Sequence, residues 1–163
     1  MHLKRIISLV IIILISQLLG CTNSRSNENK AIATSFIKAW SSHNAEKLAS
    51  LFSDDCLYEE VPSGRKFTNK QDIENYLKAT LSGVPNSVFE IVSITGSDST
   101  AVVEWIWKGT NTVGWPSLKI PATNKDFEVR GVSVMTIENN LIKKNSDYWD
   151  WNTFLTGIGI AKN

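Results

Sequence analysis

The sequence predicts an α+β domain, with helices in its first half and a strongly curved antiparallel sheet in its second half. Apolar residues recur at helical spacing up to about residue 82, whereas from Val88 onward they alternate with polar residues, as in half-buried strands. Asn139 and Asn140 separate the last two alternating runs and are typical of a tight hairpin turn. A curved sheet that follows its helices in the chain can wrap them and leave a hollow between the two layers.

Residues 1–20 have the pattern of a secretory signal peptide. Lys4 and Arg5 precede an apolar run over residues 6–19, which is too short to cross a bilayer comfortably, because a spanning helix needs about 20 apolar residues. The run ends in Leu18-Leu19-Gly20-Cys21, which resembles the lipobox of bacterial lipoproteins. That resemblance implies lipidation of Cys21 and attachment to the lipid bilayer of the cell envelope. The alternative is an ordinary signal peptide, or a weak membrane anchor, that ends by chance near a cysteine.

Residues 21–30 are predicted to form a lipid-anchored flexible tether. Thr22 to Lys30 contains only polar and charged residues, so this segment has nothing to bury in a core. The folded domain is therefore expected to cover residues 31–163. In Gram-negative sorting an Asp at the position of Thr22 would retain the protein at the inner membrane, so the resemblance implies the outer membrane if the host is Gram-negative.

Three helices are predicted in the first half of the chain. The first covers residues 31–42, whose apolar side chains form one stripe. Asn44 is expected to cap a short second helix, and an extended segment follows at residues 56–61. Thr68 begins a capping-box pattern that opens the third helix, and Gly83 is its expected end.

The second half of the chain contains four β-rich runs, at residues 88–95, 101–112, 127–137 and 141–151. In the second run Trp105 and Trp107 share one face, and in the last run Asp147 and Trp149 share one face. If these faces meet, aromatic rings surround a carboxylate. A carboxylate in such surroundings tends to have a raised pKa.

Composition argues against several classes of function. The chain has 163 residues and a formal net charge of +1, and it contains no long basic stripe, so no nucleic-acid partner is predicted. Without the signal peptide, His43 is the only histidine, and the acidic residues lack the spacing of metal ligands. Phosphate-binding glycine loops are also missing, so neither a metal nor a cofactor is expected. Cys56 is interpreted as a lone buried thiol.

Three stretches of the chain together indicate a family. They are Phe36-Ile37-Lys38-Ala39-Trp40 through Asp55, then Gly109-Thr110-Asn111 with Pro121 to Lys125 and Gly131, and finally Glu138-Asn139-Asn140-Leu141-Ile142 with Asp147-Tyr148-Trp149-Asp150 and Phe154-Leu155. From about Ala31 to Gly159 the chain resembles the SnoaL-like branch of the nuclear transport factor 2-like superfamily. This branch includes polyketide cyclases and is related to ketosteroid isomerases.

The resemblance implies a cone-shaped barrel in which helices pack inside a curved sheet, an apolar pocket within it, and frequent dimerisation through the sheet. Enzymes of this family use an acidic residue as acid and base at a carbon next to a carbonyl, and Asp147 matches that position. The chain departs from the pattern at Asn111, where many relatives have histidine, and at Asn124, which replaces a glycine.

Two functions fit these observations. One is an enzyme that isomerises, cyclises or hydrolyses a small apolar carbonyl compound, and the other is a binding module for an apolar ligand or an envelope partner. The candidate catalytic residues are Asp147, Asp150 and Tyr58. The candidate pocket residues are Trp105, Trp107, Trp149, Arg130 and Asn111, with Tyr58 or Arg130 expected to hold a developing enolate oxygen. The resemblance implies that the chain can form a homodimer.

Overall fold

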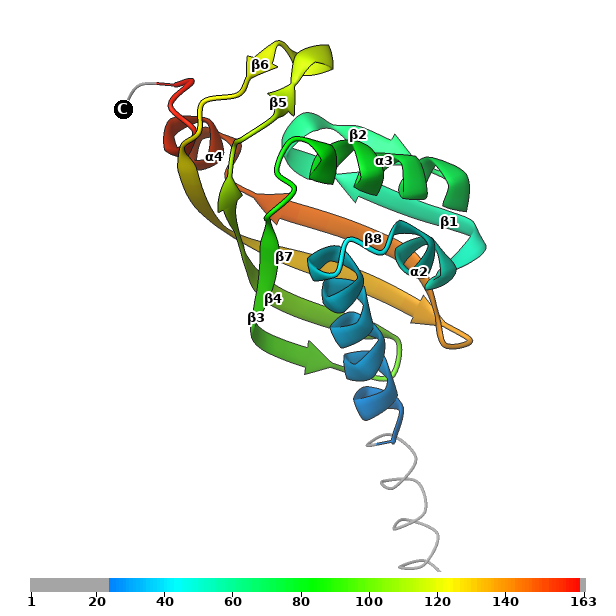
Figure 1. Cartoon of the computed structure of the whole chain (residues 1–163). Coiled ribbons are helices and arrows are strands. Elements are labelled where there is room, and N and C mark those ends of the chain that lie inside the picture. The colour runs from blue at the N-terminus through cyan, green and yellow to red at the C-terminus, as the bar shows by residue number, and fades with distance from the viewer. Residues whose placement is uncertain (1–23, 162–163) are drawn as a thin grey trace, which may run out of the picture.

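The structure is a computed structural model that describes residues 24–161, and it has the predicted α+β architecture (Figure 1). Six strands form one curved sheet in the order β2-β1-β8-β7-β4-β3. The N-terminal helix, at residues 24–41, and α3 (Lys70–Ser82) lie across its concave face. The sheet stays open, because β2 and β3 are its two edges. The signal peptide and Cys21 lie outside the described residues.

The helix boundaries follow the predicted pattern with one change of cap. Asn44 caps α2 (Ala45–Ser50), and its side chain accepts a hydrogen bond from the backbone N–H of Lys47 at 2.8 Å. The cap of α3 is Asn69, whereas the capping-box pattern had indicated Thr68. The Asn69 side chain accepts from the backbone N–H of Asp72 at 2.9 Å, which satisfies one of the N–H groups left without a partner at a helix start.

The prediction of a flexible tether is wrong for residues 24–30, which are the first turns of the N-terminal helix. Ser26 Oγ donates to the carbonyl of Gly96 at 2.9 Å, and Asn29 Nδ2 donates to the carbonyl of Ser97 at 2.8 Å. Asn29 is buried by this contact. The segment lacks apolar side chains, but its polar groups find backbone partners at the turn after β3, so it packs without a hydrophobic face.

The sheet is mixed rather than purely antiparallel. Its strands are β1 (Phe52–Glu60), β2 (Arg65–Phe67), β3 (Val88–Gly96), β4 (Thr100–Thr110), β7 (Asp126–Glu138) and β8 (Leu141–Trp149). All neighbours pair antiparallel except β1 and β8, which are parallel. Because the chain crosses the whole domain between these two strands, no short turn forces them into opposite directions.

The segments that connect the strands include one predicted turn and several elements that were not predicted. Asn139 and Asn140 have φ values of 50° and 62°, as a tight hairpin turn requires, so that prediction is confirmed. A short hairpin of β5 (Gly114–Trp115) and β6 (Ile120–Pro121), with η2 (Pro116–Leu118) between them, follows β4. Trp151 was predicted in the last strand, but β8 ends at Trp149, and Trp151 is the first residue of α4 (Trp151–Gly157).

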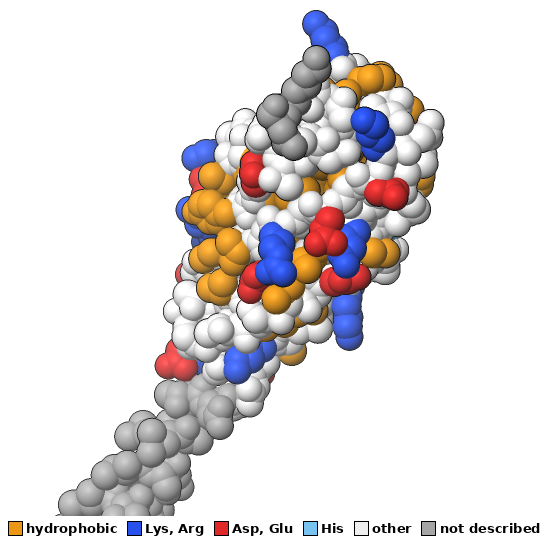
Figure 2. Space-filling view, turned by 90° about the vertical axis from the view of Figure 1, so that its left-hand side faces the viewer, with side chains coloured by type: hydrophobic (Ala, Val, Ile, Leu, Met, Phe, Trp, Pro, Cys, Tyr) orange, Lys and Arg blue, Asp and Glu red, His pale blue; other side chains and the backbone are white. Residues whose placement is uncertain are grey.

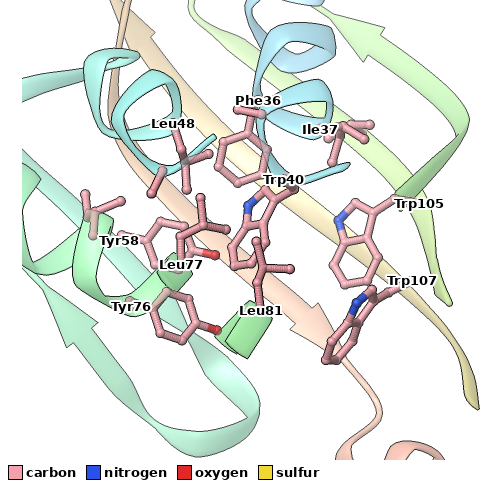
Figure 3. Packing of buried hydrophobic residues seen from close by; sticks show 14 of the residues in the cluster. Phe36, Ile37, Trp40, Leu48, Tyr58, Tyr76, Leu77, Leu81, Trp105 and Trp107 are labelled. Carbon is pink, nitrogen blue, oxygen red and sulfur yellow. The ribbon is translucent and has the colours of Figure 1, made fainter. Parts of the chain in front are cut away.

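The two faces of the sheet differ as the alternation predicted. On the outer face Lys108 pairs with Glu90 at 2.9 Å and Arg130 with Glu104 at 3.3 Å, and Figure 2 shows charged groups of both signs among apolar ones. The inner face packs aromatic side chains against the helices (Figure 3). Cys56 is buried, as expected. None of the helices within residues 24–161 has the length and apolarity that a membrane span requires.

Candidate functional site

Asp147 lies on the concave face of β8 and is only 5% exposed. Asn145 Nδ2 donates to its Oδ1 at 2.7 Å, and the Tyr58 hydroxyl donates to its Oδ2. Among the described residues no cation pairs with this carboxylate. Burial raises the pKa of Asp147, although hydrogen bonds from Ser133, Tyr58 and Asn145 act in the opposite direction. The side chain is therefore a buried acid that is held by neutral donors.

The polar contacts continue from Asp147 in two directions. Ser133 is its register partner on β7, and the hydroxyl of Ser133 accepts a hydrogen bond from Trp105 Nε1 at 2.9 Å. On the other side, Tyr58 is fully buried, and burial together with the nearby carboxylate raises its pKa well above the usual value. Tyr58 thus stays a neutral hydroxyl, and it holds the carboxyl group of Asp147 in one orientation.

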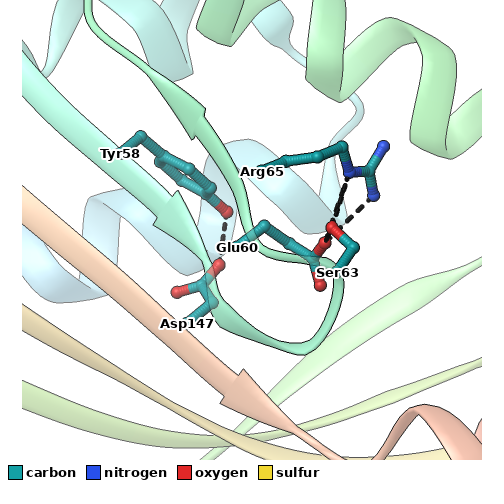
Figure 4. A network of polar contacts seen from close by, with 5 residues as sticks. All are labelled: Tyr58, Glu60, Ser63, Arg65 and Asp147. Atoms are coloured by element: carbon teal, nitrogen blue, oxygen red, sulfur yellow. Dashed lines mark hydrogen bonds and ion pairs between the residues drawn. The ribbon is translucent and has the colours of Figure 1, made fainter.

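A second buried carboxylate, Glu60, lies opposite Asp147 in the parallel β1–β8 pair, and sequence reasoning missed it (Figure 4). Its Oε2 accepts hydrogen bonds from Ser63 Oγ and from Arg65 Nη2, the latter at 3.1 Å. Its proximity contributes to the raised pKa of Asp147. The signal was present in the sequence, because Tyr58 and Glu60 are two residues apart and therefore share the inward face of β1.

The space beside these groups is divided into an inner and an outer part. The inner space, about 20 Å³, is bounded by Asp147 together with Trp40, Phe89 and Trp105, and it is large enough for about one water molecule. The outer pocket, about 160 Å³, lies between α3, η2 and α4. Both spaces share Tyr76, Thr80 and Trp149 as walls.

Aromatic side chains are the largest class of residue in the outer pocket, which we define by Arg65, Tyr76, Trp107, Trp115, Trp149 and Trp151. Trp107 stacks on Phe154 with ring centroids 5.2 Å apart and meets Trp149 edge-on at 5.9 Å. These stacked and edge-on contacts fix the rings. The tryptophans therefore partly fill the hollow and leave a pocket that suits a small ligand.

Three candidate site residues lie away from this space. Asp150 is exposed and caps α4, where it accepts hydrogen bonds from the backbone N–H of Asn152 and from Thr153 Oγ1. The bonds from Thr153 and Asn152 lower the pKa of Asp150, so it is an ionised surface group and does not suit a proton donor. Asp150 does not line the pocket, because the strand ends one residue before it.

Arg130 and Asn111 were also misplaced. Arg130 is exposed on the outer face, because even-numbered residues in this part of β7 point away from the helices. Asn111 is fully buried, but it holds the loop after β4: its Nδ2 donates to the carbonyl of Pro121 at 2.9 Å and to Thr123 Oγ1 at 3.1 Å. In both cases the residue type was suitable for a site, but the backbone directs the side chain elsewhere.

The SnoaL-like domain family matches residues 33–145. The chain belongs to the SnoaL-like domain family. A search of curated sequences finds no match. Membership of the family establishes the type of domain. Because the chain departs from the family pattern at Asn111 and Asn124, membership does not establish the site, which depends on this chain's own residues.

SnoaL-like and ketosteroid isomerase-like proteins of known structure share the fold. One from Catenulispora acidiphila, with a ketosteroid isomerase-like fold and in complex with trimethylamine, is 20% identical, with TM-score 0.70 over 80% of this chain and 93% of its own. A protein from Shewanella putrefaciens classed as a SnoaL-like polyketide cyclase is 17% identical, with TM-score 0.70 over 82% and 97%. One of the same class from Jannaschia is 11% identical, with TM-score 0.74 over 84% and 95%.

The fold of this SnoaL-like domain is thus an open, curved sheet with helices on its concave side, in agreement with the predicted cone-shaped nuclear transport factor 2-like architecture. At these identities the likeness shows the fold, while activity depends on the site. Within residues 24–161 no group of three or more His, Cys, Asp or Glu side chains lies together as a metal site would require.

Proposed function

We propose that this protein is a lipid-anchored envelope protein whose SnoaL-like pocket performs acid/base chemistry on a small apolar carbonyl compound, with Asp147 as the proton-transferring group. One observation supports this above all. Asp147 is a buried carboxylate that has no cationic partner among the described residues, and it borders the inner space, which shares Tyr76, Thr80 and Trp149 with the outer pocket. Burial that raises the pKa of an acid brings it toward the range in which proton transfer at neutral pH is efficient.

The proposed step is proton transfer at a carbon next to a carbonyl group. The carboxylate of Asp147 takes the proton, the C–H electron pair forms the new double bond, and the carbonyl electrons move to oxygen. Return of the same proton to another carbon completes an isomerisation. In a cyclisation the enolate carbon attacks a second carbonyl, the electrons of that carbonyl move to its oxygen, and the proton on Asp147 passes to this alkoxide. Tyr58 acts as a positioning residue, because its hydroxyl is already bonded to Asp147 Oδ2.

The proposal of membrane attachment rests on the sequence. The apolar run before Cys21 and the lipobox-like Leu18-Leu19-Gly20-Cys21 support lipidation in the cell envelope, at the outer membrane if the host is Gram-negative. Expressed in bacteria, the protein should partition into detergent with the membranes, and Cys21→Ala should stop that partition. Normal lipid labelling of the variant would contradict this part of the proposal.

The chemistry is tested by deuterium exchange at the carbons next to the carbonyl of cyclohexanone in D2O, followed by NMR. Asp147→Asn preserves shape and removes the titratable base, so the protein-catalysed exchange should fall by roughly 10²- to 10⁴-fold while binding of the ketone is retained. Asp150→Asn is the matched control and should leave the rate unchanged. Equal rates in parent and Asp147→Asn would rule out Asp147 as the base.

A stability measurement tests the buried state of Asp147 independently of catalysis. Because the folded pKa of Asp147 is raised, the parent should be most stable relative to Asp147→Asn below the usual Asp pKa of 3.8, and should lose that relative stability as pH rises through the folded pKa. Glu59 should show the opposite pH dependence of stability. Lys144 and Lys66 lower the pKa of Glu59 to about 2, so its contribution to stability is present above pH 4.5 and is lost as the pH falls through the folded pKa. Urea denaturation of Asp147→Asn and Glu59→Gln across pH compares the two.

A second candidate function is non-catalytic binding of an apolar ligand or an envelope partner. The observation in its favour is that Tyr58 and Asn145 already occupy both oxygens of Asp147, as in a structural hydrogen-bond network. Under this function Asp147→Asn would bind ligands like the parent, and neither protein would accelerate exchange.

A further inference from the structure

The outer pocket has one charged wall residue, Arg65, and its other wall residues are aromatic, aliphatic, small or hydroxyl side chains. We propose that this pocket binds a small aromatic carboxylate, with the ring between the tryptophans and the carboxylate at Arg65. This inference goes beyond the proposed function, because binding of the anion does not require catalysis by Asp147.

The orientation of the Arg65–Glu60 pair gives the pocket a positive wall. Glu60 is fully buried behind the wall, while the Arg65 side chain is 38% exposed and faces the pocket. The guanidinium lies over the ring of Tyr76, with its carbon 4.9 Å from the ring centroid, so stacking and the ion pair both fix its position. Because the Glu60 carboxylate lies behind the wall and the Arg65 guanidinium faces the pocket, the electric field in the pocket favours an anion.

The donors of Arg65 are only partly used. Glu60 Oε2 accepts from Arg65 Nε at 3.4 Å and from Nη2 at 3.1 Å, and Ser63 Oγ accepts from Nε at 2.8 Å. Nη1 has no hydrogen-bond partner among the described residues. A guanidinium that is held on one side by a buried carboxylate retains N–H groups for a second carboxylate on the other side.

Trp107 supplies an independent observation. Its side chain is 4% exposed and lines the outer pocket, and its Nε1 is buried without a hydrogen-bond partner in residues 24–161. A buried donor without an acceptor costs about 1–3 kcal/mol. Arg65 Nη1 and Trp107 Nε1 are thus two N–H donors at this pocket that have no partner among the described residues, and N–H donors match an electron-rich ligand.

The volume limits the ligand to about one ring. A cavity of about 150 Å³ is known to hold benzene, and the outer pocket has about 160 Å³. Its aromatic walls offer offset-stacked and edge-on contacts to a ring. Benzoate is therefore the simplest probe that has both a ring and a carboxylate.

The test is calorimetric titration of the full lipidated chain in detergent with benzoate, benzamide and phenyltrimethylammonium. Benzoate should bind at least tenfold more tightly than neutral benzamide, and the cation should bind most weakly. Arg65→Gln should abolish the preference for benzoate, and Arg65→Lys should restore part of it because the charge remains. Lys66→Gln, an exposed neighbour that pairs with Glu59, is the matched control and should keep the preference. Trp107→Phe should weaken benzoate binding severalfold.

Equal affinity for the three probes, tighter binding of the cation, or a benzoate preference that survives in a folded Arg65→Gln variant would overturn the proposal, as would the absence of saturable benzoate binding. Circular dichroism checks that each variant is folded. Loss of exchange chemistry in the cyclohexanone assay would leave this binding result intact, so the failure of either proposal is recognised separately.

A different observation concerns the opposite end of the molecule. The N-terminal helix is fixed to the turn after β3 by Ser26 and Asn29, and a Cβ on Gly96 would lie 2.7 Å from the Ser26 carbonyl oxygen, so the contact is close. From Cys21 to Ser24 there are three residue steps, which span at most about 11 Å even when fully extended. A lipid on Cys21 would therefore hold this end of the domain near the membrane.

The strands define the distance from this end to the pocket. β4 begins beside the turn after β3 and runs over Thr100–Thr110 to the loop that precedes the outer pocket. At ~3.3 Å per residue this strand is about 35 Å long. We infer that, in the lipidated protein, the turns at residues 97–99 and 139–140 face the bilayer and the outer pocket opens into water (Figure 1). This inference rests on the proposed lipid anchor.

The orientation is tested on the lipidated chain in vesicles that contain a spin-labelled headgroup lipid, with a fluorophore on Asn140→Cys or Leu118→Cys. The fluorophore at residue 140 should be quenched severalfold more than that at residue 118. A Gly-Ser insertion after Asn23 is the control and should reduce the difference. Equal quenching without the insertion, or stronger quenching at residue 118, would overturn the orientation. Failure to float with vesicles would overturn the anchor and the orientation together.

Discussion

The two ends of the same curved sheet are built on different physical principles. At the pocket end, β4, β8 and α4 bring together large aromatic rings, and a pocket of about 160 Å³ remains between them. At the anchor end, which we define by the turns at residues 97–99 and 139–140, the N-terminal helix docks through hydrogen bonds to backbone carbonyls. The rings leave a pocket between them, whereas the small polar contacts at the anchor end fit closely.

The difference shows where this fold places its site. Rigid aromatic walls can line a cavity without collapsing, because each ring is fixed by several others. The close contact between the N-terminal helix and the turn after β3 leaves no room for a ligand, but it fixes the position of the start of this helix. The pocket end is therefore suited to recognition, and the anchor end to attachment.

The largest effect is expected at the pocket end. Phe154 is 2% exposed and contacts Trp107, Trp115, Phe127, Trp149 and Trp151. Phe154→Ala should lower the free energy of unfolding by about 3–5 kcal/mol, because it removes a buried ring and leaves a cavity. Urea denaturation measures the change. A loss below about 1 kcal/mol would mean that the rings contribute little to stability, and that the contrast between the ends is wrong.

A smaller effect is expected from Gly96→Ala at the anchor end. The added methyl group would lie 2.7 Å from the carbonyl oxygen of Ser26 and 3.0 Å from Lys30 Cγ, so the helix start must move. We expect a loss of about 1–3 kcal/mol, as for overpacking. Faster proteolytic cleavage near Arg25 and Lys30 should accompany it. Gly64→Ala is not a suitable control because its φ is +71°; Ser99→Ala, which changes no close contact of this kind, is preferable.

The smallest effect is expected from Asn29→Ala, which removes one hydrogen bond to the carbonyl of Ser97. The net contribution of such a bond is about 1 kcal/mol. Hydrogen exchange should become faster in the first turns of the helix while the amides of β7 and β8 stay protected. Unchanged exchange over residues 24–30 would indicate that packing, rather than this bond, fixes the helix.

The sequence was sufficient for features that depend on local pattern. The helices, the period-two strands, the Asn139-Asn140 turn and the α+β class follow from spacing and cap chemistry, which neighbouring residues decide among themselves. The inward faces were predictable for the same reason, so Trp105, Trp107 and Asp147 could be placed on the concave side from alternation alone.

Features that depend on contacts between distant segments were not predictable in this way. The parallel pairing of β1 with β8 brings Glu60 opposite Asp147, and no local pattern links residues so far apart in the chain. Residues 24–30 lack apolar side chains, and only the carbonyls of Gly96 and Ser97 explain why they are helical and docked.

The sequence by itself determined the class of fold, most of the helices and strands, and the acid on the concave face, because those follow from short-range spacing and from side-chain chemistry. Tertiary structure decided which polar residues reach the site. It turned Arg130 outward, used Asn111 and Asp150 to hold a loop and cap a helix, and brought Arg65 to the pocket wall. The direction of a side chain depends on strand register and on where an element ends, and packing across the whole domain fixes both.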